Sequence, residues 1–346
     1  MSKKYVFNLS KIQYGDILFS STSAKDSRLI ARATGGDFSH AMLGVGNSVI
    51  HAMPDGVYSK NPQRFIFDKP EHFCVMRLRE KPSDAVIFKA INHARKWVGG
   101  LYSKIEAGKS VILHQTETAA KSPKQYCSKL VAECYEEAGI KLVLNAGYCT
   151  PHDLTLSELL IDVPDYFREA TVADIAYIES FDPNLPIQRE TFTWLENLRV
   201  LAKEREAHTV LHMDDVVPFL LLYPSHDKAV CKFVNQTLYL YLYDIDRKIN
   251  PWRYDEHVFL SALKGLAFTE IKRILSREYD INEPDLERRE SNVKNARNNL
   301  QRMPLDYFKL DLAHAQNLYN ENYRRVEVLN NVSRRFGLQR ADVPAN

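Results

Sequence analysis

The feature that most constrains the fold of this chain is a change in composition near Pro183. Before it, short apolar runs alternate with glycine-containing turns, which is typical of short strands. Beyond it, glycine occurs only at Gly265 and Gly337, and apolar residues recur at helical spacing. The 346 residues are enough for two domains, so the sequence predicts an α+β domain over 1–178 and an all-α domain over 179–346.

Net charge and cysteine usage limit the classes of function. A formal net charge of +2 gives no general reason to expect a nucleic-acid partner. The five cysteines form no C-x-x-C pair, so we expect no disulfide framework, no metal site and no cofactor. The first residues contain no apolar signal segment, and no apolar run is long enough to span a bilayer. We therefore expect a protein made as a soluble cytoplasmic chain, and signal-independent secretion stays open.

The second half is predicted to be a helical bundle of unknown role. Its prolines are expected to end helices, so that antiparallel neighbours are joined by short loops. Apolar periodicity predicts helices over five segments: Arg189 to Glu206, Lys228 to Arg247, Glu256 to Tyr279, Asp285 to Arg302 and Asp306 to Phe336. This half is also where a protein partner could bind.

A hairpin in the first half carries two histidines. Residues 38–53 are apolar around a turn at 46–48, which predicts strands over 38–45 and 49–53. His40 and His51 lie on the two arms. If the turn is centred between residues 45 and 46, the histidines face each other directly, and a centre one residue later makes them diagonal neighbours. In both registers the two rings can meet.

A cysteine begins the helix that is predicted over 128–138. Cys127 lies at its first turn, where unpaired backbone N–H groups and the helix dipole favour a thiolate. The alternative interpretation is a small buried hydrophobic residue. A catalytic cysteine needs an imidazole within reach and a third polar group that orients this imidazole. His40 and His51 can supply both roles.

The order of these motifs resembles the circularly permuted branch of the NlpC-type, papain-like cysteine hydrolases, the YiiX/YaeF-like group. The resemblance covers about residues 14–165 and rests on five motifs: Gly15-Asp16, Phe38-Ser39-His40-Ala41, Gly56-Val57, Tyr126-Cys127-Ser128 and Pro151-His152-Asp153-Leu154. It implies a permuted papain-like domain, with a small antiparallel sheet and a helix that carries the nucleophile.

The resemblance also implies residue roles. Cys127 is the nucleophile, His40 the base and His51 the orienting residue. Tyr126, Ser128 and Ser39 are candidates for the substrate or oxyanion site. Many YiiX-like members have a glutamate where His51 stands, and a histidine there is more similar to the lecithin:retinol acyltransferase group.

The implied activity is cleavage of an amide through a thioester on Cys127, in a cell-wall peptide or an acylated amino compound. The first alternative is a lipid acyltransferase or phospholipase of the lecithin:retinol acyltransferase type. The second is a delivered antibacterial effector whose helical half binds a partner.

Overall fold

The computed structural model describes residues 3–21, 36–103, 107, 124–182 and 184–340. The chain divides into two compact units, which are Met1–Asn184 with Thr209–Asp215, and Leu185–His208 with Val216–Asn346. A helix that the sequence predicts over 27–34, and most of an irregular connection expected over 103–124, lie outside the described residues. The domain boundary between residues 178 and 179 stays a prediction.

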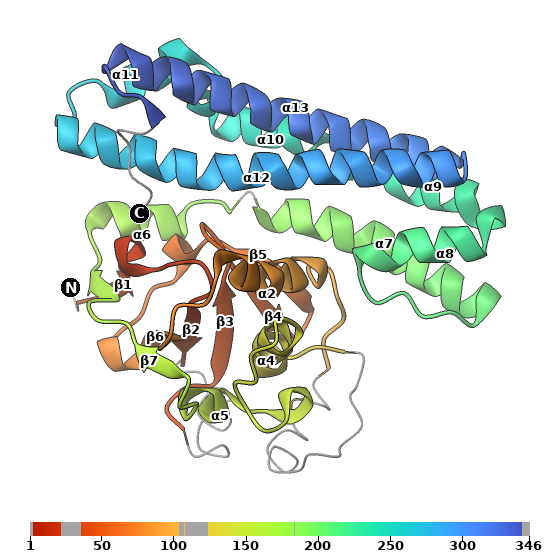
Figure 1. The fold of residues 1–346 in the computed structure, drawn as a ribbon, viewed down its shortest axis with the longest axis horizontal. Helices are drawn as coiled ribbons and strands as arrows, with labels where there is room; N and C mark the ends of the chain where they lie inside the picture. The colour runs from red at the N-terminus through yellow and green to blue at the C-terminus, as the bar shows by residue number, and fades with distance from the viewer. Residues whose placement is uncertain (1–2, 22–35, 104–106, 108–123, 183, 341–346) are drawn as a thin grey trace. The chain divides into compact units, whose positions relative to one another are not determined.

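The first unit is built on a six-stranded antiparallel sheet with the strand order β5-β4-β3-β2-β6-β7 (Figure 1). Its strands are β2 (Ile17–Ser20), β3 (His40–Gly44), β4 (Val49–Met53), β5 (Gly56–Lys60), β6 (Phe73–Leu78) and β7 (Leu160–Asp162). A second, two-stranded sheet pairs β1 (Tyr5–Phe7) with β8 (Phe167–Glu169). The helices are α2 (Asp84–Lys96), α4 (Cys127–Glu137), α5 (Pro151–Thr155) and α6 (Val172–Glu179).

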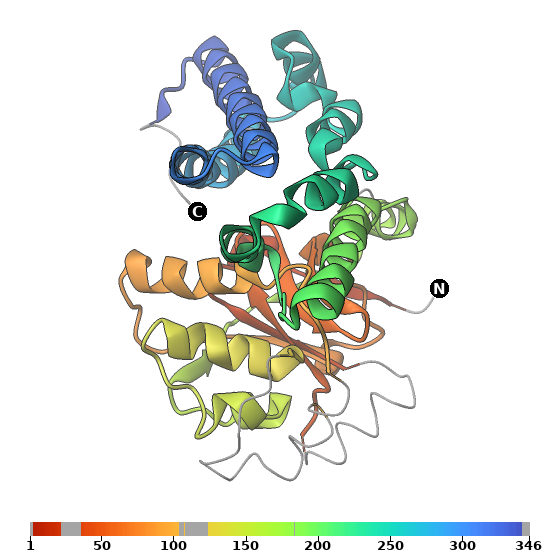
Figure 2. The same ribbon diagram turned by 90° about the vertical axis from the view of Figure 1, so that its right-hand side faces the viewer.

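Alternate side chains of each strand point to opposite faces of the six-stranded sheet, and each face packs against a separate apolar core. In β3, Ala41 and Leu43 join a core that α2 and α4 complete. Figure 2 shows these two helices side by side against one face of the sheet. Met42 instead joins a second core, which is rich in phenylalanine, on the opposite face. His40 follows the parity of Met42, so its side chain leaves the strand on the phenylalanine face.

One small helix of the first unit differs from expectation. The sequence indicates a helix near residues 156–160, but the helix is α5, which ends at Thr155. The Thr150 hydroxyl accepts from the backbone N–H of Asp153, whose carboxylate accepts from the Thr150 N–H, and this capping box starts the helix earlier. Leu160 instead enters β7 and pairs with Leu78.

The second unit is all-helical, so the expected α+β domain followed by a helical domain is confirmed as the fold class. Its helices are α7 (Asn184–Glu206, whose first residue belongs to the first unit), α8 (Val216–Leu222), α9 (Asp227–Asn235), α10 (Leu242–Ile249), α11 (Glu256–Leu263), α12 (Phe268–Arg302) and α13 (Asp306–Arg335). The two longest, α12 and α13, pack along each other and bury apolar residues such as Leu275 and Val332. Among the described residues, no helix is both long and apolar enough to cross a bilayer.

Two helix boundaries of this unit differ from the sequence prediction. The helix expected to begin near residue 285 is continuous with α12, and Pro284 lies inside it. Side-chain amides bind the carbonyls of the preceding turn, since Asn282 donates to the Glu278 carbonyl and Asn322 of α13 donates to the Asn282 carbonyl. The break falls instead at Gly265, whose φ of +83° suits glycine.

The helix expected over 228–247 is also interrupted, between α9 and α10. Thr237 donates its hydroxyl proton to the Val234 carbonyl, and the Glu190 carboxylate of α7 accepts from the Leu238 N–H at 2.9 Å. A carboxylate from another helix thus satisfies the backbone at a point where helical periodicity alone predicts continuation.

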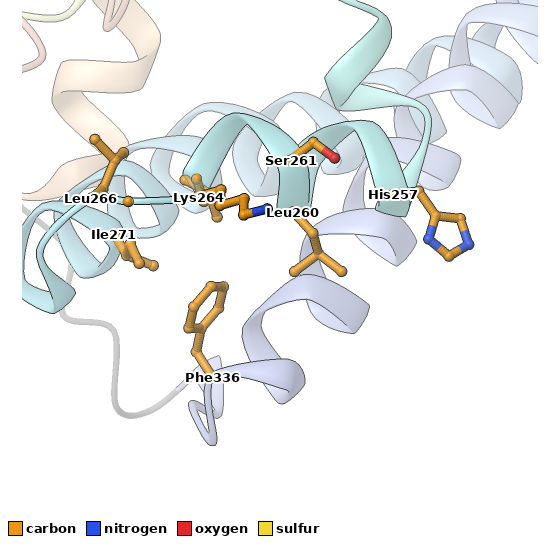
Figure 3. Close-up of a pocket in the computed structure, with 9 residues that line it drawn as sticks. His257, Leu260, Ser261, Lys264, Leu266, Ile271 and Phe336 are labelled. Carbon is orange, nitrogen blue, oxygen red and sulfur yellow. The ribbon is translucent and has the colours of Figure 1, made fainter.

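A hollow of about 520 Å³ lies beside α11 and the start of α12. Leu260, Ile271 and Phe336 form its apolar wall, while Lys264 and His257 stand at its border (Figure 3). It belongs wholly to the second unit and holds no member of the predicted catalytic set.

Candidate active site

The β3–β4 hairpin brings the two predicted histidines together. Gly46, with a φ of +101°, allows the tight turn, and the N–H of Val45 donates to the Ser48 carbonyl at 2.8 Å. The strands pair as Leu43 with Ile50 and Gly44 with Val49. This register corresponds to the later of the two possible turn centres, so the two histidines are diagonal neighbours.

A hydrogen bond of 2.8 Å joins Nε2 of His40 to Nδ1 of His51. Their ring centroids are 5.1 Å apart, and the ring planes are nearly perpendicular. Since Nε2 of His40 faces His51, Nδ1 is the nitrogen of His40 that stays available to another group. His51 itself is buried, with 5% of its surface exposed, so its ring is held by packing as well as by this bond.

The Cys127 thiol lies against the backbone of β3 on either side of His40. Cys127 is the first residue of α4, and its Sγ is 4.0 Å from the Ser39 carbonyl oxygen. The Ala41 backbone also hydrogen bonds the sulfur. Within the described residues, the β3–β4 ladder is confined to the end nearest the turn, at Leu43 and Gly44. The other end of β3, which includes His40, therefore has backbone that faces the start of α4.

Burial keeps both imidazoles uncharged at neutral pH. Loss of hydration is the main cause that lowers the pKa of His40 to about 4, and the positive charge of Lys60 adds to it. The pKa of His51 also lies well below its usual value, because of burial, then His40, then Lys60. Among the described residues, no carboxylate opposes these shifts, so the pair is a neutral hydrogen-bonded unit rather than an ion pair.

The helix N-terminus does not by itself make Cys127 a thiolate. Burial is the largest influence and raises the pKa of the thiol. Hydrogen bonds from the backbone of Ala41, Ser128 and Cys127 itself, and from the Ser128 side chain, act in the opposite direction. The backbone N–H groups at the helix start do lower the pKa of the Cys127 thiol, as expected. Desolvation raises this pKa by more than the N–H groups lower it.

The three residues predicted beside the nucleophile lie next to it with different surroundings. The Tyr126 side chain is 1% exposed, and its hydroxyl donates to the Gly147 carbonyl at 3.1 Å. Ser128 is equally buried and donates its hydroxyl proton to the Cys149 carbonyl at 2.7 Å. Ser39 is half-buried and presents its carbonyl to the thiol. Tyr126 and Ser128 therefore fasten the start of α4 to the segment around residues 147–149.

Comparison with known proteins gives a family match over much of the first unit. Residues 11–146 match the sequence model of the permuted papain-like amidase enzymes, the YaeF/YiiX, C92 family. Residues 11–146 are therefore similar to a permuted papain-like amidase domain. A similar solved structure is the crystal structure of metalloprotein yiiX from Escherichia coli O157:H7, with 18% identity over 44% of this chain and 97% of that chain, and a TM-score of 0.32. A search of curated proteins gave no match.

Sequence reasoning missed one tyrosine of the amidase domain. Tyr102 pairs through its backbone with Gln125, two residues before Cys127. Burial, and then the charge that Cys127 would carry, raise the pKa of the Tyr102 hydroxyl to about 12. Its hydroxyl has no hydrogen-bond partner within the described residues. The glycine pair at residues 99–100 indicates a helix end, and no local pattern marks the tyrosine.

Lys60 is the second residue of the amidase domain that the sequence did not single out. It is the last residue of β5, and its charge lowers the pKa of both His40 and His51. The described residues contain no group of three or more His, Cys, Asp or Glu side chains that could hold a metal ion. The reactive groups described for the hairpin, the start of α4 and their neighbours include a thiol, two imidazoles, a phenol and an ammonium.

Proposed function

We propose that this protein hydrolyses an amide bond through a thioester on Cys127, with His40 as the base and His51 as the residue that orients it. The observation that carries the proposal is the 2.8 Å bond between Nε2 of His40 and Nδ1 of His51, next to a thiol that contacts the backbone on both sides of His40. The thiol lies against the β3 backbone at residues 39 and 41, and the histidine pair lies at the same end of that strand, which supports these roles for a nucleophile, a base and an orienting group. Among the described residues, no hydrogen bond joins the thiol to the His40 ring.

The hydrogen-bond pattern suggests a proton path. If Nδ1 of His40 takes the thiol proton, Nε2 must carry a hydrogen, so His40 donates to Nδ1 of His51 and the hydrogen of His51 lies on Nε2. A neutral thiol and a neutral imidazole are the resting forms, as the raised pKa of Cys127 and the lowered pKa of His40 indicate. Proton transfer then accompanies attack rather than preceding it.

The covalent steps balance without any co-reactant other than water. The Cys127 sulfur bonds to the carbonyl carbon and its proton moves to His40. The C–N bond then breaks, and the amine leaves with that proton. Water attacks the thioester and gives its proton to His40, the acid is released, and the sulfur recovers a proton.

Two groups are suited to stabilise the oxyanion. One is the backbone N–H of Cys127 at the start of α4, and the other is the Tyr102 hydroxyl, whose pKa is influenced by the charge on Cys127. The Ser128 hydroxyl donates its proton to the Cys149 carbonyl in this structure, so it would have to turn away from Cys149 to donate to an oxyanion or to the charged Cys127 sulfur. Tyr126 is likewise engaged by Gly147.

The proposed substrates are cell-wall peptides and acylated amino compounds. Lipid acyl transfer is a second candidate, because a histidine occupies the orienting position, as in the lecithin:retinol acyltransferase group. The two candidates differ in the bond that yields the acyl group, which is an amide in the first and an ester in the second.

Mass spectrometry of the intact protein separates these candidates. The protein is incubated separately with peptidoglycan fragments and with phospholipids, quenched with acid and analysed for an added acyl mass. We expect an adduct on the peptide that contains Cys127, and none in Cys127→Ala. Cys231→Ala is the matched control, since it removes a half-buried thiol of the second unit. An adduct that persists in Cys127→Ala would contradict the nucleophile assignment.

A further inference from the structure

Lys60 lies on the same side of the sheet as the histidine pair. In the β4–β5 ladder, Val49 is opposite Lys60 and His51 is opposite Tyr58, so Lys60 and His51 point to the same face. The Lys60 ammonium is 4.4 Å from the centroid of the Phe65 ring, and that ring is 6.2 Å from the His51 ring. Phe65 therefore separates the cation from the imidazole at short range.

The neighbouring cation, Arg64, differs from Lys60 because both terminal nitrogens of its guanidinium donate hydrogen bonds, while its Nε forms none within the described residues. Arg64 donates to the carbonyls of Tyr177, Ser180 and Phe181, and its guanidinium lies 3.6 Å from the Asp182 carboxylate. All four partners belong to residues 177–182, so Arg64 fastens the end of α6 and the segment after it. Its role is accounted for by structure.

Lys60 has no such set of partners. It is half-buried, and within the described residues its ammonium forms no hydrogen bond and no ion pair. Asp182 attracts it from a distance and raises its pKa, but burial and the charge of Arg64 lower that pKa, and burial dominates. Lys60, Arg64 and Asp182 together carry a net charge of about +1. A partly desolvated ammonium without a partner is costly, so it calls for an explanation.

This charge also opposes the proposed chemistry in the unliganded protein. The imidazolium that forms on His40 when Cys127 attacks would face the charge of Lys60 and the uncharged His51, while Arg64 and Asp182 act on Lys60. A second positive charge is disfavoured there. An anion beside Lys60 would remove this repulsion and make proton transfer to His40 easier.

We propose that the Lys60 ammonium, held against Phe65, is an anion subsite that takes a carboxylate or phosphate group of the substrate beside the His40–His51 pair. The inference rests on the proposed function of Cys127 and His40, and it specifies that the substrate carries a negative charge. A neutral substrate would leave the repulsion in place, so the subsite both selects anionic substrates and couples their binding to the base.

Matched substrates test the selectivity. Succinyl 4-nitroanilide carries a carboxylate where butyryl 4-nitroanilide carries a methyl group. We expect Lys60→Met to lower the ratio of kcat/KM for the succinyl compound to kcat/KM for the butyryl compound by about tenfold, which corresponds to roughly 1.4 kcal/mol. For the butyryl compound alone, kcat/KM should rise in Lys60→Met, because the repulsion that opposes protonation of His40 is removed. Lys60→Arg should retain most of the preference. Equal losses on both substrates would show a merely structural role and overturn the proposal.

A titration that needs no turnover separates this inference from the proposed function. Histidine NMR signals of Cys127→Ala are followed against pH in chloride, in acetate and in inorganic phosphate, and His40→Gln identifies the His40 signal. We expect acetate or phosphate to raise the pKa of His40, and which of them does so identifies the anion. In Lys60→Met, the pKa of His40 should already be higher without an anion, and neither acetate nor phosphate should change it further.

If the anions act equally on both proteins, or if Lys60→Met leaves the histidine signals unchanged, the anion subsite is wrong. If instead the titration behaves as expected but neither anilide is cleaved, the subsite stands and the proposed amidase reaction on these substrates fails. The two hypotheses therefore have separate outcomes.

Discussion

The candidate active site and the helical unit treat buried charge in opposite ways. Around the candidate active site, His40 and His51 hydrogen bond each other instead of a carboxylate, and Lys60 has no ion pair within the described residues. In the helical unit, buried charges are paired. Arg253 donates twice to Glu278 at 3.0 Å, and Arg325 donates to Asp246 at 2.6 Å.

This difference separates structural from functional burial of polar groups. A buried pair of opposite charges satisfies itself, and breaking it leaves one charge unpaired. Neutral imidazoles and an unpaired ammonium gain no such stability, so their burial is better explained by reactivity. The comparison leads to predictions about activity in the first unit and about stability in the second.

The largest effect is expected at Cys127. Cys127→Ala should lower turnover by at least about 10³-fold, because the thioester cannot form, while the unfolding temperature changes little. Turnover of a chromogenic amide and thermal unfolding measure the two quantities. Cys231→Ala, in α9, should leave turnover unchanged. Turnover that survives in Cys127→Ala would remove the functional half of the comparison.

The two histidines should differ in the size of their effects. His40→Ala removes the proposed base and should lower kcat by about 10²–10⁴-fold. His51→Asn keeps a polar group at the orienting position, so its loss should be smaller than that of His51→Ala. Single-turnover kinetics measure these rates. If His51→Ala lowered the rate more than His40→Ala, the assigned roles would have to be exchanged.

In the helical unit, breaking a buried pair should reduce stability without loss of catalysis. The Arg253 and Glu278 side chains are 23% and 8% exposed, so Arg253→Met should lower the free energy of unfolding of this unit by about 3 kcal/mol. Chemical denaturation measures this free energy. Lys309→Met, which breaks an exposed pair with Asp306, is the control and should change it little. Loss of kcat per folded molecule would contradict the structural role.

The smallest effect is expected at two titratable groups of α13 that are largely buried and, within the described residues, have no partner of opposite charge. Burial raises the pKa of Asp311 to about 6 and lowers that of His314 to about 4. The folded state thus holds a proton on Asp311 more tightly than the unfolded state, and stability falls as pH rises from about 4 to 6. His314 has the opposite sign, since stability rises as pH increases from about 4 to 6.5. The two dependences largely cancel.

Removing one of these groups should reveal the other. Asp311→Asn should make the stability of the helical unit rise with pH between about 4 and 6.5, and His314→Gln should make it fall. Trp97→Phe restricts tryptophan fluorescence to Trp194 and Trp252, which both belong to the second unit. Thermal unfolding followed by that fluorescence measures the change. Identical pH profiles in both variants would show that these carboxyl and imidazole groups do not titrate as their burial indicates.

Local patterns predicted much of the first unit. The turn at Gly46 fixed both arms of the hairpin, and the predicted helix after Cys127 agrees with α4 to within one residue at each end. Continuity of helices in the second unit was harder to predict. Pro284 lies inside α12, where Asn282 and Asn322 donate to carbonyls of the adjoining turns, and Glu190 from another helix helps to end α9 before α10. Such partners are distant in the sequence, so a local pattern cannot reveal them.

The sequence by itself determined which reactive groups exist and which local elements carry them: a thiol at a helix start and two histidines on one hairpin. The tertiary structure decided the protonation states of these groups and which residues lie beside them. Burial made the imidazoles neutral and raised the pKa of the thiol, although the helix N-terminus alone favours the thiolate. The tertiary structure also placed Tyr102 and Lys60 near the candidate active site. Desolvation and long-range proximity depend on the packed surroundings of a residue, and no short stretch of sequence contains them.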